Sequence, residues 1–138
     1  MPKRKIMMTI SDYNRLKSLL VSDFVQAIGP KSYLKDLRAE LERAVIVPSK
    51  KIPADVVTMN STVRLRDLDT DERETYALVY PEQADIAANK LTILAPIGTA
   101  ILGYRAGDVV SWRVPSGSSQ IEIEELLSQP EREHAVLR

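Results

Sequence analysis

Residues 90–103, with the sequence KLTILAPIGTAILG, change their periodicity at a single proline. The residues before Pro96 are typical of a short apolar strand, and the apolar residues after it recur at helical spacing. Proline is favoured at the first position of a helix, where its missing N–H would have no partner anyway. Gly103 suits the position just after a helix end. The stretch therefore predicts a strand-to-helix corner that a core must hold, and the sequence leaves open whether this corner also binds a partner.

The composition of the chain is that of a soluble globular protein, with 44% apolar and 28% charged residues. Its length of 138 residues is enough for one domain or for a small domain with an appendage. Without any cysteine, disulfides, thiolate metal sites and cysteine nucleophiles are excluded. The charged start lacks the apolar segment of a signal peptide, and no apolar run approaches the ~20 residues of a membrane span. We therefore expect a cytoplasmic protein with no membrane association.

The net charge of zero argues against a dedicated nucleic-acid binder, although passing proximity to DNA or RNA stays open. This zero conceals an asymmetry between two parts of the chain. Residues 1–51 contain 11 basic and 5 acidic residues, a surplus of +6, whereas residues 52–138 contain 8 and 14, a surplus of −6. Such a division indicates two surfaces that face different partners, or a chance segregation of solvated faces.

The N-terminal part has the pattern of two helices. A helix start is predicted at Thr9, where Asp12 in the first turn would complement the helix dipole. An apolar stripe follows, formed by Ile10, Tyr13, Leu16, Leu20, Phe24 and Ile28. Gly29-Pro30 breaks the pattern, and a second apolar period covers residues 33–45. We predict an antiparallel hairpin over residues 1–47, with helices of roughly 15–18 residues, and a linker over residues 48–53.

After the linker the apolar period changes to two, which is typical of strands. Strands are predicted at residues 55–60, 62–67, 73–80, 109–114 and 121–127, with an Asp-rich turn at residues 67–71. A short helical or irregular excursion is expected at residues 82–89, and a polar tail around Pro130. The prediction is an α+β chain whose second domain, residues 54–138, is a β-sheet domain with one short helix.

No catalytic constellation is present in the sequence. The Asp67-x-Asp69-x-Asp71 pattern resembles a calcium loop, but Glu72 replaces the required glycine and Leu78 the bidentate glutamate, so a solvated turn is favoured. His134 is the only histidine, and the glycines form no phosphate-binding loop. Trp112 and Tyr76 are interpreted as ordinary core or half-buried strand residues. A binding or regulatory module with no enzymatic activity, cofactor or metal is therefore expected.

Several blocks in order carry a family resemblance. They are Pro53-x-Asp55-Val56-Val57-Thr58-Met59-Asn60-Ser61, Leu78-Val79-Tyr80-Pro81, Ala95-Pro96-Ile97-Gly98-x-Ala100-x-Leu102-Gly103, Gly107-Asp108, Trp112 and Gln129-Pro130-Glu131. With them the chain resembles the GreA/GreB family of transcription elongation factors, and within it the Rnk-type regulators of nucleoside diphosphate kinase. The resemblance implies an N-terminal antiparallel coiled coil, an FKBP-like β-sheet domain, and binding to bacterial RNA polymerase at its secondary channel.

The resemblance also implies two sets of contact residues. The polymerase rim would be contacted by Leu94, Ala95, Pro96, Ile97 and Gly98, and the hairpin tip would be formed by Asp23, Phe24, Gly29 and Pro30. Transcript cleavage in Gre factors uses a carboxylate pair at the tip, whereas residues 22–33 offer only Asp23. We therefore expect a monomeric, non-catalytic regulator that competes with Gre factors. The alternatives are an FKBP-like prolyl isomerase and a direct partner of nucleoside diphosphate kinase.

Overall fold

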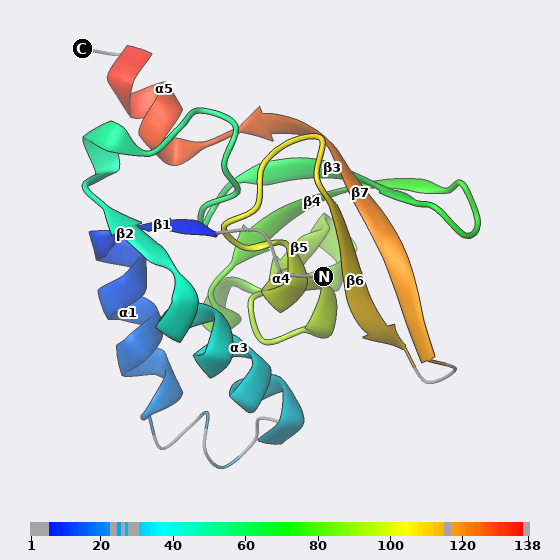
Figure 1. Ribbon diagram of the computed structural model, residues 1–138, viewed down its shortest axis with the longest axis horizontal. Helices are drawn as coiled ribbons and strands as arrows, with labels where there is room; N and C mark the ends of the chain where they lie inside the picture. The colour runs from blue at the N-terminus through cyan, green and yellow to red at the C-terminus, as the bar shows by residue number, and fades with distance from the viewer. Residues whose placement is uncertain (1–5, 23–24, 26, 28–30, 115–116, 137–138) are drawn as a thin grey trace.

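The N-terminal part forms two helices that lie side by side (Figure 1). The computed structural model describes residues 6–22, 25, 27, 31–114 and 117–136. Helix α1 (Ile10–Leu20) and helix α3 (Lys31–Arg43) pack against each other. Strands β1 (Met7–Thr9) and β2 (Val45–Val47) pair in parallel at the end of the helices nearest the sheet domain. This small ladder ties the start of α1 to the end of α3.

Helix α1 begins as predicted and ends earlier than predicted. The Thr9 hydroxyl accepts the N–H of Asp12 at 3.1 Å, which confirms the N-cap. After Leu20, the Ser22 hydroxyl donates to the Leu19 carbonyl and accepts the N–H of Val25. A serine side chain that bonds nearby backbone groups competes with the helical ladder. The expected helix lengths of 15–18 residues are therefore wrong, since α1 has 11 residues and α3 has 13.

A five-stranded mixed sheet forms the rest of the fold, in the order β5-β4-β3-β7-β6. Its strands are β3 (Thr62–Asp67), β4 (Arg73–Val79), β5 (Lys90–Thr92), β6 (Val109–Val114) and β7 (Gly117–Ser128). Within this sheet β4 and β5 pair in parallel, and the other neighbouring strands pair antiparallel. The predicted α+β class is confirmed, whereas the likeness to FKBP stays a prediction.

Short helical segments connect the strands. Three 3₁₀ turns, η1 (Ser49–Lys51), η2 (Pro81–Gln83) and η3 (Ile86–Ala88), lie in the expected linker and in the predicted excursion after β4. Helix α4 (Pro96–Ile101) follows β5 directly. In Figure 1, α4 lies between the hairpin and the sheet.

Two predicted segments have a different structure. Residues 55–60 do not form a strand of the sheet. The N–H of Val57 donates to the Tyr104 carbonyl, and the Val57 carbonyl accepts the N–H of Gly103. Side chains on both faces of the segment are buried. The predicted polar tail forms helix α5 (Pro130–Val136), where Glu133 accepts the N–H of Gln129 at 3.0 Å. The sheet domain therefore has a second α-helix beyond the one that was expected.

One hydrophobic core joins the hairpin to the sheet. Leu16, Leu37 and Ile6 belong to the same buried cluster as Ile101 and Ile123. Shared burial of this kind stabilises both parts together, because a helix pair this short is marginal alone. In the described part of the chain, no helix is long and apolar enough to cross a membrane.

Candidate functional site

The corner predicted from the sequence is a tight turn between β5 and α4. The N–H of Ala95 donates to the Thr92 carbonyl at 3.1 Å, and the N–H of Leu94 donates to the Thr92 hydroxyl at 3.2 Å. Ala95 is the N-cap of α4 with Pro96 at the start of the helix, as predicted. Gly103 has a φ of +84°, which confirms it as the residue that ends the helical segment.

The inner side of the corner is closely packed. A Cβ atom on Gly98 would lie 2.5 Å from the Thr92 carbonyl oxygen and 3.2 Å from Cδ1 of Leu78. The buried Thr99 hydroxyl donates to the Ile93 carbonyl at 2.7 Å. Gly98 is buried, and because it has no side chain α4 can lie close to β5.

The outer side of the corner is partly open to solvent. Four consecutive residues, all uncharged, are half-buried there: Leu94, Ala95, Pro96 and Ile97. We call these four residues the corner surface. Half-buried apolar side chains on a rigid turn can contact a partner at little cost in conformational entropy.

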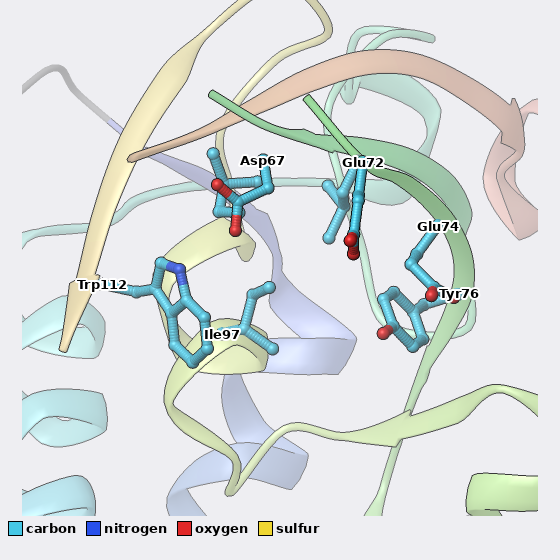
Figure 2. A pocket seen from close by; sticks show the side chains of 8 residues that line it. Asp67, Glu72, Glu74, Tyr76, Ile97 and Trp112 are labelled. Atoms are coloured by element: carbon cyan, nitrogen blue, oxygen red, sulfur yellow. The ribbon is translucent and has the colours of Figure 1, made fainter. Parts of the chain in front are cut away.

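A cavity of about 240 Å³ opens beside the corner surface (Figure 2). Its wall includes Ile97 from α4, and the other side chains come from four strands or their connecting turn. The lining residues are Leu65, Asp67, Glu72, Glu74, Tyr76, Ile97, Trp112 and Ile121. Figure 2 shows the carboxyl groups, the phenol and the indole turned toward the same space.

The two faces of the sheet differ in charge. The arginines of β3 and β4 form ion pairs on the face away from the cavity, where Glu124 accepts from Arg64 and Arg73 at 3.1 and 3.0 Å. Strand side chains alternate between faces, so Glu72 and Glu74 project opposite to Arg73, into the cavity. The cavity face therefore presents carboxylates, and no lining residue is basic.

A half-buried carboxyl group, that of Asp12, lies between the hairpin and the sheet domain. Oδ2 of Asp12 accepts the N–H of Met59 at 3.1 Å, and Oδ1 accepts the Tyr80 hydroxyl at 3.3 Å. Burial raises the pKa of Asp12 from 3.8 to about 6, and the charge of Glu131 adds to this effect. Arg15, one turn further along α1, stacks over the Tyr80 ring at 3.7 Å and pairs with Glu82 at 2.6 Å.

The Asp-rich turn at residues 67–71 is a turn, as predicted. One oxygen of Asp67 accepts the N–H groups of Asp69 and Thr70, at 2.8 and 3.3 Å. Asp69 accepts the Ser119 hydroxyl at 2.7 Å. Across the residues that the structure covers, no group of three or more His, Asp or Glu side chains could hold a metal ion.

Other sequence-based candidates have different outcomes. The tip residues Asp23, Phe24, Gly29 and Pro30 lie outside the described residues, as does the His134 side chain. Sequence reasoning missed the role of Asp12, which it assigned only to the helix dipole, and it missed the cavity. It also missed Ile86, whose side chain is 94% exposed on η3.

Comparison with known proteins identifies the family. Residues 52–127 match the family described as transcription elongation factor GreA/GreB, C-terminal domain, and residues 4–47 match the Rnk N-terminus. The chain belongs to the GreA/GreB family. The expected resemblance is thus confirmed for both parts.

Individual relatives in the family agree with this assignment. The chain is 43% identical over 96 residues to the "Regulator of nucleoside diphosphate kinase" of Escherichia coli K12, covering 69% of this chain and 71% of that protein. It is 39% identical over 87 residues to GreA of Clostridium botulinum Eklund 17B, covering 63% of this chain and 54% of that factor. A solved GreA/GreB elongation factor from Nitrosomonas europaea is 41% identical, with a TM-score of 0.72 over 91% of this chain and all of that structure.

Proposed function

We propose that this chain is a non-catalytic transcription regulator that binds RNA polymerase at the rim of the secondary channel through its corner surface. The observation that carries the proposal is the hydrogen-bonded, uncharged bend at Leu94–Ile97 in a chain of the GreA/GreB family. The Rnk-type N-terminus and the likeness to a solved elongation factor support it. Docking at the rim would place this chain in competition with Gre-type factors.

The proposal includes the absence of transcript cleavage. A second metal ion between protein and RNA needs more than one carboxylate to hold it. Residues 22–33 contain only Asp23, and the next carboxylate in the sequence is Asp36. Stalled elongation complexes mixed with the purified protein should therefore release no short RNA 3′ fragments. Cleavage above the rate of polymerase alone would contradict this part of the proposal.

Retention of core polymerase on the immobilised protein tests the docking surface. The variant Pro96→Asp places a charge in the corner surface and should reduce retention by about tenfold or more, because an unpaired charge is costly to desolvate. An acidic residue in the first turn of a helix is favourable, so α4 should still form. Leu127→Asp, a similar change at an exposed position of β7, is the matched control and should bind as the wild type does. If Pro96→Asp and the wild type retain core polymerase equally, the corner is not part of the interface.

A prolyl isomerase is the second candidate function, because the cavity combines Trp112 and Tyr76 with apolar residues between a helix and a sheet. Asp67, Glu72 and Glu74 make its opening acidic, which does not suit an uncharged proline ring. A proline-isomerisation assay on a short peptide should show no acceleration. A third candidate follows from the name of the Escherichia coli relative, and co-purification with nucleoside diphosphate kinase tests it.

A further inference from the structure

The cavity beside the corner has unused binding capacity. The buried indole N–H of Trp112 has no hydrogen-bond acceptor within the described structure. Within the described residues, the side chains of Glu72 and Glu74 form no hydrogen bond or ion pair. The two carboxylates thus line a space, beside the Trp112 side chain, in which no basic group of the lining residues pairs with them.

Other aromatic rings of this molecule make cation–π contacts with basic side chains. Arg15 lies over Tyr80, Lys17 over Tyr13, and Arg43 over Tyr104. Of the described rings, those of Trp112 and Tyr76 have no such neighbour, although both line the acidic cavity. Among aromatic side chains, tryptophan attracts cations most strongly. The cavity therefore has two features that favour a cation, an aromatic ring and negative charge, and none of its lining residues is basic.

The size of the cavity restricts its ligand. Sites that enclose a drug-sized molecule measure roughly 300–1,000 Å³, whereas this cavity measures about 240 Å³. It is suited to one long side chain. The apolar lining residues Leu65, Ile97 and Ile121 suit the methylene stem of such a side chain, and the carboxylates suit its charged end.

We infer that the cavity binds one arginine or lysine side chain of the protein segment that docks on the corner surface. Ile97 belongs to both the corner surface and the cavity wall, so one segment can contact both. Opposite charge argues for a basic occupant, because three carboxylates surround the opening. For the identity of the partner this inference rests on the proposed function. For the ligand class it rests on the cavity alone.

Trp112 is the only tryptophan of the chain, so intrinsic fluorescence reports on the cavity directly. The probe is N-acetyl-arginine methylamide, and its lysine counterpart shows which cation fits better. The uncharged control is N-acetyl-citrulline methylamide, which has nearly the same shape. We expect a saturable change with the cationic probes, weakened by salt, and little change with citrulline. Equal responses to arginine and citrulline, or no saturable change with either cation, would overturn the inference.

Variants locate the binding and separate it from polymerase docking. Glu72→Gln and Glu74→Gln should each lower the affinity for the cationic probe about two- to fivefold, as expected for the loss of an exposed charge pair. Glu125→Gln, on the opposite face of the same sheet, is the matched control and should change nothing. An equal loss in Glu125→Gln would show that net charge, not the cavity, attracts the probe, and would overturn the inference. Probe binding that survives in a chain that does not retain polymerase would instead reject the proposed function and keep the cavity assignment.

Discussion

The carboxyl group of Asp12 should make the stability of this protein fall as the pH rises from 4 to 8. It lies where α1 meets the sheet domain, and its surroundings are the Met59 N–H, the Tyr80 hydroxyl and the carboxylate of Glu131. Burial raises its pKa to about 6, from 3.8 for an ordinary aspartate. The folded state therefore prefers the protonated acid, and ionisation at higher pH opposes folding.

The size of the effect follows from the two pKa values. Each pH unit between them corresponds to about 1.36 kcal/mol, so the full effect is at most about 3 kcal/mol. The stabilising contribution is complete below pH 3.8, decreases as the pH passes through 6, and is absent at pH 8. The variant Asp12→Asn has no charge to bury at any of these pH values. Its free energy of unfolding, relative to the wild type, should rise by up to about 3 kcal/mol between pH 4 and pH 8.

Urea denaturation followed by far-ultraviolet circular dichroism at pH 4, 6 and 8 measures this difference. Subtracting the wild-type curve at each pH cancels the titration of the other carboxyl groups, including those in ion pairs on the sheet. Glu42→Gln, which removes an exposed carboxyl of α3, is the control and should parallel the wild type. If the wild type and Asp12→Asn stay parallel from pH 4 to pH 8, the pKa of this carboxyl is not raised in the folded state and the reasoning fails.

Two further predictions concern the inner side of the corner. Gly98→Ala should lower the free energy of unfolding by about 1–3 kcal/mol, because its Cβ would meet the Thr92 carbonyl oxygen at 2.5 Å; thermal unfolding measures the loss, and an unchanged midpoint would mean that β5 and α4 separate at no cost. Thr99→Val should cost about 1–3 kcal/mol, since the Ile93 carbonyl loses the donor at 2.7 Å; Thr99→Ser, which keeps the hydroxyl, should recover most of it, and equal losses in both variants would point to packing instead.

Local rules correctly predicted the start of α1 and both ends of α4. The Thr9 cap, Pro96 at the start of α4 and Gly103 after its end each depend on one backbone hydrogen bond or one backbone angle. Such features are set by neighbours within four residues. The same kind of signal was present and overlooked at α5, where Pro130 is followed by Glu131 and Glu133. Proline and acidic residues in a first turn indicate a helix, as they did at α4 and α1.

Tertiary burial caused the main error in the strand prediction. The run from Val56 to Met59 has three β-branched residues followed by a methionine, a composition that favours a strand. All four of these residues are buried, and the backbone of Val57 pairs with the segment after α4 instead of a ladder. Apolar periodicity cannot distinguish a buried connecting segment from a strand when both of its faces are covered.

The cavity could not be predicted from the sequence, because its residues are scattered. Tyr76 and Trp112 are 36 positions apart, and each alone is typical of an ordinary strand residue. They face one space only because β6 and β4 lie on either side of the β3–β7 pair in the sheet. Asp12 shows the same limit: its place in the first turn predicted a contact with the helix dipole, but its partners, Met59 and Tyr80, are 47 and 68 positions away.

In the corner, the exposed residues come first along the chain and the buried structural residues follow. A docking role can therefore be tested by substitutions that leave the structural residues unchanged. Gly98, Thr99 and Ile101 are buried and hold α4 against β5, while the four residues before them are partly open. Gly103 fixes the far end, because a Cβ there would lie 2.7 Å from that of Ile6, and its carbonyl accepts the N–H of Met7 at 3.1 Å. The corner is thus attached to β1 and through it to the hairpin. A partner that contacts the corner surface therefore meets a surface whose position relative to α1 and α3 is already set, and a substitution at Pro96 can change binding without loosening this attachment.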